Sequence, residues 1–267
     1  MISNNCSFPI KDIDLLYQEG HKNKVKVYLE RILLSEIDNH EKKELFLEKY
    51  KYRCSFIPLG YRQGNSDMIK GHIQKVLSLS LSDFEKKELV LSRRYSMSYP
   101  PIESAYENGQ SETVRVYIEQ ILSSELSSDD KKELLLAKNG GGYPSIIFAY
   151  LEGQSETIRV YIEQILSSEL SSDDKKELLL AKNGDGYPSI IFSYEDGHID
   201  TIRVYLKLVL SSSFSDSEKK ELILAKSDDD FSLNKLKCVD SIKVYVEEVM
   251  GSQLNFDDKK YLLKFFN

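Results

Sequence analysis

Apolar side chains recur at helical spacing in the middle of the chain. One stripe consists of Ile158, Tyr161, Ile162, Ile165 and Leu166. Its spacing of i, i+3, i+4, i+7 and i+8 predicts a helix that begins around Ser155 and buries one face. Arg159 and Glu163 lie one turn apart on another face, where an ion pair contributes at most roughly 0.5 kcal/mol. The apolar stripe therefore decides the fold of this segment.

Two shorter helices flank this stripe. Residues 144–152 form the first, because proline is tolerated in an opening turn and Gly153 follows where a left-handed residue ends a helix. Ser171 begins the other as a capping residue and leads into residues 175–181, with acidic residues in the first turn that suit the helix dipole. Residues 183–186, Asn-Gly-Asp-Gly, predict a turn that returns the chain.

The same order of elements repeats along the chain. Residues 109–148 and 153–192 differ at only two of their forty positions, one of which is Gly141 in the first block and Asp185 in the second. Copies of a Lys-Lys-Glu-Leu motif begin at Lys42, Lys86, Lys131, Lys175 and Lys219, with a decayed copy at Lys259. Their spacings of 44, 45, 44, 44 and 40 residues indicate a repeat protein.

The repeat predicts one all-α domain over residues 1–267: a helical solenoid of six units of about 44 residues with three helices each. The units are placed at residues 10–53, 54–98, 99–142, 143–186, 187–230 and 231–267. Each unit packs only on its neighbours, so the molecule is expected to be elongated. In the shorter last unit, the residues expected to close the end of the core are Phe256, Leu262, Leu263, Phe265 and Phe266.

The loop and the following helix resemble the ankyrin repeat. Residues 185–188, Asp-Gly-Tyr-Pro, followed by Gly197-His198 and Ile202, resemble the pattern in which Asp-Gly and Thr-Pro-Leu precede a Gly-His turn and a second apolar helix. The proline stands one position early, the histidine is glutamine in neighbouring units, and the period is 44 rather than about 33 residues. The third helix accounts for the added length.

A longer motif, Ala-Lys-x-x-Asp-Gly-x-Pro followed by Gly-His and Ile-Arg-x-Tyr, resembles a more particular group. It is similar to the ankyrin-like C-terminal region of enterobacterial type III secreted effectors of the EspL and enterotoxin-like group. The resemblance covers residues 99–226 well and the other units loosely. That family carries a cysteine-protease region upstream of its repeats, which nothing in this sequence matches. The resemblance therefore implies a recognition module and does not imply protease activity.

Charge and cysteine content narrow the class of function. The net charge of −7 argues against general binding to nucleic acid or to an anionic membrane, because neutralising phosphate needs a basic field. Cys6, Cys54 and Cys238 lie far apart and outside the repeat pattern, which is typical of free thiols in a reducing compartment. The sequence has no secretory signal and no run near ~20 apolar residues, so a cytoplasmic protein is expected. The resemblance to type III secreted effectors adds the expectation that a type III system delivers the protein into a host cell.

A thiol enzyme would need a cysteine, a histidine and an orienting carboxylate in one place. The histidines occupy different repeat positions. Because distant units of a solenoid do not touch, only Cys6 or Cys54 could pair with His21, His40 or His72. Ordinary buried or surface roles are favoured, and no catalytic residue is predicted.

Metal and phosphate sites lack their usual signatures. There is no Cys-x-x-Cys and no closely spaced histidine pair, so no metal site or cofactor is predicted. Residues 228–230, three aspartates, are interpreted as a solvated acidic loop. The glycines of residues 139–142 lack the Gly-Lys-Ser/Thr ending of a phosphate-binding loop and are interpreted as a chain reversal.

Tyrosines form three columns across the repeats. Two of them occupy packing positions: Tyr17, Tyr61, Tyr106, Tyr150 and Tyr194 end the first helix, and Tyr28, Tyr117, Tyr161, Tyr205 and Tyr245 lie on the stripe of the second. These two columns are interpreted as core. The third column, Tyr99, Tyr143 and Tyr187, lies in the loops between units, where aromatic side chains are suited to anchor a partner. Together with Asp185, which tunes the charge of the loop edge, these residues are the predicted protein-binding site.

A basic column runs beside the stripe of the second helix: Lys26, Lys70, Arg115, Arg159, Arg203 and Lys243. Most of its members have a carboxylate nearby. The column is therefore interpreted as a neutralised solvent face rather than as an anion-binding ladder.

These features predict a non-enzymatic protein–protein interaction scaffold that acts as a bacterial effector or as the recognition module of one. The expected partner is a protein, with a host protein as one class, and neither nucleic acid nor a membrane is expected to bind. Two alternatives remain open. One is an antitoxin-like or immunity-like inhibitor that covers a basic toxin, and the other is a cysteine-dependent effector enzyme.

Overall fold

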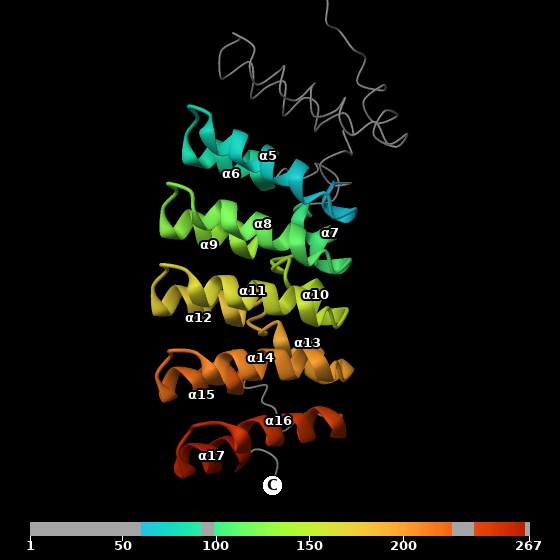
Figure 1. The fold of residues 1–267 in the computed structure, drawn as a ribbon, viewed down its shortest axis with the longest axis vertical. Helices are drawn as coiled ribbons and strands as arrows, with labels where there is room; N and C mark the ends of the chain where they lie inside the picture. The colour runs from blue at the N-terminus through green and yellow to red at the C-terminus, as the bar shows by residue number, and fades with distance from the viewer. Residues whose placement is uncertain (1–59, 92–98, 226–237, 265–267) are drawn as a thin grey trace, which may run out of the picture.

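The computed structural model describes residues 60–91, 99–225 and 238–264, and its regular structure in these ranges is entirely helical (Figure 1). The helices are α5 (Ser66–Ser78), α6 (Asp83–Leu91), α7 (Ile102–Glu107), α8 (Ser111–Leu122), α9 (Ser128–Leu136), α10 (Ile147–Leu151), α11 (Ser155–Ser167), α12 (Ser172–Leu180), α13 (Ile190–Asp196), α14 (Ile199–Ser211), α15 (Asp216–Leu224), α16 (Val239–Gly251) and α17 (Phe256–Leu263). The prediction of an all-α protein is confirmed for these ranges. Outside them lie the first predicted unit, residues 10–53, and Cys6, Tyr17, His21, Lys26, Tyr28, His40, Cys54, Asp228–Asp230, Phe265 and Phe266.

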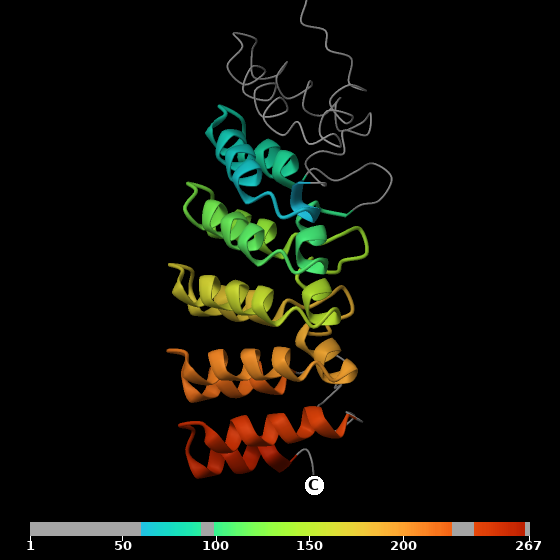
Figure 2. The same cartoon turned by 45° about the vertical axis from the view of Figure 1, so that its right-hand side comes forward.

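The helices stack in layers along the long axis of the molecule (Figure 1). Three successive layers have the predicted three helices: α7, α8 and α9, then α10, α11 and α12, then α13, α14 and α15. The long second helices lie side by side in the order α5, α8, α11, α14 and α16, and the third helices in the order α6, α9, α12, α15 and α17. The short first helices form a separate row, which Figure 2 shows next to the connecting loops.

The apolar stripe of α11 is buried as predicted. Ile158, Tyr161, Ile162 and Ile165 are fully buried, while Leu166 is half-buried at the edge of the core. The helix begins at Ser155, where it was expected. The helical period of the sequence thus predicted correctly which face of α11 is buried.

The first helices are shorter than predicted. α10 begins at Ile147 rather than at Pro144, because the intervening residues bond to the preceding unit. The backbone N–H of Ser145 donates to the carbonyl oxygen of Leu136 at 3.0 Å, and its hydroxyl donates to that of Ala137 at 2.7 Å. These bonds fasten the entry of one unit to the third helix of the unit before it.

A glycine ends each first helix and also admits a side chain from the next unit. Gly109 and Gly153 have φ angles of +65° and +63°, which L side chains rarely adopt. A Cβ atom on Gly109 would lie 2.4 Å from Oε1 of Gln154. The Nε2 of Gln154 in turn donates to the carbonyl oxygen of Glu107 at 3.2 Å, and His198 makes the equivalent contact one unit later. Glycine is therefore required both for backbone conformation and for the approach of neighbouring units.

Buried tyrosines join successive layers, and the interpretation of both columns as core is confirmed for the described residues. The ring pairs are Tyr61 with Tyr117, Tyr106 with Tyr161, Tyr150 with Tyr205, and Tyr194 with Tyr245, with centroids 6.2 to 6.4 Å apart. The second member also holds its own unit together. For example, the hydroxyl of Tyr161 donates to the carbonyl oxygen of Leu178 in α12 at 3.0 Å.

A ladder of ion pairs, not predicted from the sequence, crosses the same layers along the third helices. Lys132 contacts Asp174 at 2.7 Å and Glu177 at 3.1 Å in the next unit. Hydrogen bonds from Lys132 and Ser171 hold the pKa of Asp174 below its usual value. The equivalent lysines of the other described units are Lys87, Lys176 and Lys220, each paired with the following layer. The second lysine of the repeated motif therefore links units.

Three described members of the basic column, Arg115, Arg159 and Arg203, have carboxylate partners, as interpreted, although one expected pair is wrong. Arg159 pairs with Glu156 at 2.9 Å and not with Glu163, since a carboxylate one turn nearer the helix N-terminus is the better placed partner. Arg203 instead reaches Glu248 of the next layer at 2.5 Å.

The end of the stack is closed by fewer residues than expected. Leu262 is buried and Leu263 packs on the core, as predicted. Phe256 is 78 % exposed, so its predicted role in closing the core is wrong. It occupies the start of α17, a position that points away from the packed face, and Leu254 is buried instead.

Two tyrosine substitutions should separate the roles of the two core columns. The hydroxyl of Tyr150 is buried and meets no hydrogen-bond partner in the described part of the chain, whereas that of Tyr161 is bonded. We expect Tyr161→Phe to lower the free energy of unfolding by about 1 kcal/mol, and Tyr150→Phe to leave it unchanged or raise it. Urea denaturation of the two variants measures this difference. Equal destabilisation would contradict the assignment.

His72 takes the place of the second-helix tyrosine in its unit. The imidazole is buried, and its Nε2 meets no hydrogen-bond partner among the residues that the structure describes. Burial lowers the pKa of His72 from 6.5 to about 4. The folded protein therefore disfavours the protonated imidazole that the unfolded chain accepts below pH 6.5.

Stability should consequently fall as the pH drops from 6.5 towards 4, because the unfolded state binds the proton first. The loss is at most about 1.4 kcal/mol for each pH unit in this window. His72→Tyr, which restores the residue of the other units, should flatten this part of the curve. Melting temperatures of the wild type and of His72→Tyr between pH 6.5 and 4 test this expectation. Parallel curves would show that His72 does not contribute to the pH dependence of stability.

Candidate binding surface

Three of the third helices, α9, α12 and α15, end in a left-handed residue. Ala137 after α9 and Ala181 after α12 have φ angles of +42° and +41°, a conformation that costs an L residue roughly 1 kcal/mol. The hydroxyl of Ser145 donates to the carbonyl oxygen of Ala137, and that of Ser189 to Ala181, both at 2.7 Å. These buried hydrogen bonds hold the exit from each helix in the same geometry.

An asparagine organises the loop that follows. The Oδ1 of Asn139 accepts hydrogen bonds from the backbone N–H groups two and four residues ahead, at 3.0 and 3.1 Å. Its own N–H donates to the carbonyl oxygen of Tyr143 at 2.9 Å. Asn183 repeats both side-chain bonds one unit later, at 3.0 and 2.9 Å, which confirms the turn predicted at residues 183–186. The loops are thus fixed before any partner binds.

The predicted binding residues lie along this loop edge. Tyr99 and Tyr143 are 49 % and 37 % exposed, Asp185 is exposed, and Tyr187 is half-buried. The edge offers aromatic surface to solvent, most of it from the first two tyrosines. Tyr187 is the least accessible of the predicted set. That these residues bind a partner stays a prediction.

Neighbouring loops touch through glycines. A Cβ atom on Gly142, whose φ angle is +77°, would lie 3.2 Å from the Cα atom of Gly184 in the next loop. The loop carrying Tyr143 is therefore packed against the loop carrying Tyr187. This contact brings two of the predicted residues onto one continuous edge.

Glu103 lies beside the same loop and was not recognised in the sequence. It stands where the next unit has the buried Ile147, and its side chain makes a hydrogen bond with that of Asn139. Burial raises the pKa of Glu103 to about 7, against the smaller opposing effect of this hydrogen bond. A carboxyl group that titrates near neutral pH thus contacts the residue that organises the loop.

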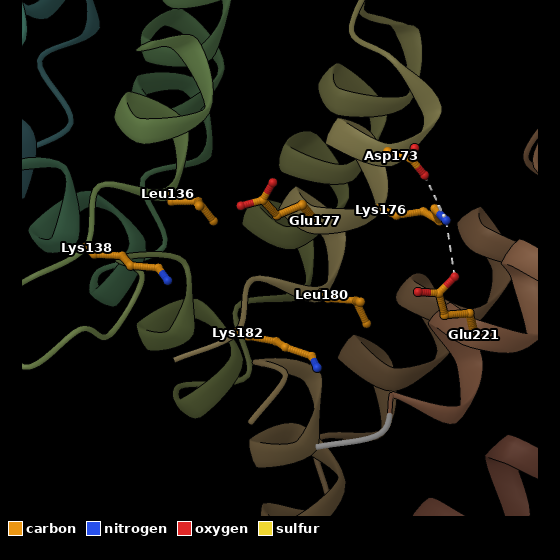
Figure 3. Close-up of a pocket in the computed structure, with 8 residues that line it drawn as sticks. All are labelled: Leu136, Lys138, Asp173, Lys176, Glu177, Leu180, Lys182 and Glu221. Atoms are coloured by element: carbon orange, nitrogen blue, oxygen red, sulfur yellow. Dashed lines mark hydrogen bonds and ion pairs between the residues drawn. The ribbon is translucent and has the colours of Figure 1, made fainter. Parts of the chain in front are cut away.

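A hollow of about 370 Å³ adjoins the loop edge (Figure 3). Leu136 and Leu180, the last residues of α9 and α12, line it from equivalent positions, and Lys138 and Lys182 follow directly after the left-handed alanines. Figure 3 shows the two lysine side chains extending in the same direction, one from each unit. The sequence carried a signal for this feature, the Leu-Ala-Lys triplet that follows the repeated motif.

Other chemical groups do not form a second site in the described residues. Cys238 is a half-buried free thiol at the N-cap of α16, and hydrogen bonds with Ser241 lower its pKa. In residues 60–91, 99–225 and 238–264, no three or more His, Cys, Asp or Glu side chains converge in a way that could hold a metal ion. None of the described helices has the length and apolar character needed to cross a membrane.

Comparison of the chain with protein-family models, curated proteins and solved structures gave no match. The candidate site is therefore described from the structure alone: it is a preformed loop edge with exposed tyrosines, next to a hollow lined by two leucines, three lysines and three carboxylates. Such an open surface is suited to contact another macromolecule, whereas small-molecule sites usually enclose their ligand.

The contact between loops can be tested with adjacent glycines. Gly142→Ala should destabilise the protein by about 1–2 kcal/mol, because it places a side chain at positive φ and against Gly184. Gly141→Asp should be tolerated, since it recreates the Asp185 loop of the next unit. Thermal unfolding of the two variants provides the comparison. If Gly142→Ala proved as stable as the wild type, the loops would not be packed as described.

Proposed function

We propose that this protein is a non-enzymatic protein-binding scaffold built as an ankyrin-like solenoid of six three-helix repeats. The repeat of the sequence and the stacked layers of the described helices support the architecture. Each layer is fixed to the next by buried tyrosine pairs and by lysine–carboxylate ion pairs. A rigid array of this kind presents loops to a partner without a large cost of ordering them.

The observation that carries the proposal is the fixed geometry of successive loops. The same asparagine and serine hydrogen bonds hold them in two neighbouring units, and the loops contact each other through glycine. Tyr143 is thereby displayed at the surface by a loop that binding need not reorganise. Exposed aromatic side chains on a rigid support often dominate protein interfaces.

A protein is the proposed partner, and the resemblance to secreted effectors makes a host protein the first class to examine. In this proposal the chain acts in the cytoplasm, either of the bacterium or of the host cell that receives it through a type III system. Catalysis, a cofactor and nucleic acid have no part in it.

A combined Tyr99, Tyr143 and Tyr187 to Ser variant tests the loop edge. Loss of a central aromatic anchor typically costs about 2 kcal/mol, so the variant should fail to recover the partner that the wild type captures from host or bacterial lysate. Mass spectrometry of both captures identifies that partner. Circular dichroism and melting must first show that the variant keeps its helices.

The matched control replaces the same three tyrosines with phenylalanine. This variant keeps the aromatic rings and should retain most of the captured partner. Full recovery by the folded Ser variant would place the interface on another face, such as the one carrying Arg115, Arg159 and Arg203.

A further inference from the structure

Glu103 distinguishes the loop at residues 139–143 from the equivalent loop at residues 183–187. The two loops differ in sequence at one position and have the same asparagine hydrogen bonds. Glu103 lies in α7 where the next two units have Ile147 and Ile191, both of which are buried. A carboxyl group therefore contacts the first loop, whereas the second loop has a hydrocarbon side chain at the equivalent position.

An asparagine connects this carboxyl group with the backbone of the loop. The Oδ1 atom of Asn139 accepts hydrogen bonds from the N–H groups of Gly141 and Tyr143, at 3.0 and 3.1 Å. Its amide nitrogen is the donor that remains for the hydrogen bond with Glu103. The Oε2 atom of Glu103 is buried and meets no hydrogen-bond partner in the described part of the chain. The carboxyl group is thus only partly satisfied where it lies.

The charges around Glu103 do not favour its ionisation. Its helix packs on α8 and α10. The titratable groups of these helices and of the loop are Glu112, Arg115, Tyr117 and Glu119 on α8, Tyr150 on α10, and Lys138 and Tyr143 in the loop. Glu103 makes no ion pair with any residue that the structure describes, and Arg115 is paired with Glu112 at 3.3 Å. Burial, with a smaller effect from Glu107, raises the pKa of Glu103 to about 7 against the hydrogen bond of Asn139.

We propose that the protonation state of Glu103 controls how firmly the loop at residues 139–143 is held, and with it the display of Tyr143. The neutral carboxyl group stays buried and accepts the hydrogen bond of Asn139. The ionised group turns towards solvent, because burial of a charge without a counter-ion is unfavourable, and Asn139 loses a contact that orients it. This step rests on the proposed function, since it regulates the same binding site.

The direction of the effect follows from proton linkage. In a loosened loop Glu103 is in water and has its ordinary pKa of 4.5, whereas the held loop raises the pKa to about 7. The held state therefore binds the proton more tightly. Its added stability is complete below pH 4.5 and is lost as the pH rises through about 7. Between about pH 6 and about pH 8, the equilibrium constant for loosening should increase roughly tenfold.

Amide hydrogen exchange of the full chain, followed by NMR, tests this expectation with a control inside the molecule. The N–H groups of Tyr143 and Tyr187 each bond to the asparagine of their own loop. The ratio of their exchange rates therefore cancels the intrinsic effect of pH on exchange. In the wild type this ratio should rise roughly tenfold from about pH 6 to about pH 8. A constant ratio would overturn the proposal.

Two substitutions remove the titrating group. Glu103→Ile installs the residue of the next two units, and Glu103→Gln keeps an acceptor for Asn139 but cannot ionise. Both variants should show a constant exchange ratio over the same pH range. The matched control is Glu107→Gln, which removes an exposed carboxylate of the same helix. It should keep the rise and move its midpoint to lower pH, because Glu107 contributes to the raised pKa of Glu103. A rise that persisted in Glu103→Gln would contradict the role given to Glu103.

Binding of the captured partner extends the test to function. Glu103→Gln should bind it as the wild type does at about pH 6 and more tightly than the wild type at about pH 8, by up to roughly tenfold. The comparison at one pH cancels any titration of the partner itself. Equal binding at both values would contradict regulation of the site. The exchange ratio needs no partner, so a constant ratio would overturn this proposal alone, whereas recovery of the partner by the Ser variant would overturn the loop-edge interface alone.

Discussion

The edge-to-face contact between tyrosines of neighbouring units is the interaction on which the described structure depends. One ring comes from the end of a first helix and the other from the middle of the next unit's second helix. Such pairs stabilise by about 0.5–1.5 kcal/mol beyond their burial and prefer a defined angle. In three of the four pairs the second tyrosine also donates its hydroxyl to the third helix of its own unit. A single residue type therefore fixes both the distance between layers and the position of the helix within each layer.

The surface features follow from this internal register. Once the third helices are placed, left-handed alanines give the chain the same conformation where it leaves α9 and α12, and asparagine bonds close both loops. Lys138 and Lys182, which line the hollow, occupy equivalent positions because they follow those alanines directly. Regular spacing at the surface is thus a consequence of regular packing in the core.

Much of the local structure could be predicted from the sequence. The stripe around Tyr161, the capping role of Ser171 and the Asn183 turn all depend on residues close in the chain, and the structure agrees with each. Features that join different units could not be predicted in the same way. The late start of α10 and the pairing of Lys132 with Asp174 depend on how one unit lies on the next.

The candidate site shows the same difference between features within one unit and features that join two units. The sequence located the loop tyrosines, because loops and aromatic residues have local signatures. It did not locate the hollow, since Leu136 and Lys138 come together with Leu180 and Lys182 of the next unit only after the layers stack. The exposure of Phe256 was missed for a related reason: an apolar residue gives no sign in the sequence of which face of a terminal helix it occupies.

The near-identity of residues 109–148 and 153–192 has a consequence for the size of the surface. Each of these blocks meets its neighbours through the same residue types: glycine against glutamine or histidine, tyrosine against tyrosine, and lysine against carboxylate. A further copy inserted between them would find matched contacts on both sides. The length of the loop edge is then set by the number of copies, since each added block brings one more loop and leaves the rest of the protein unchanged.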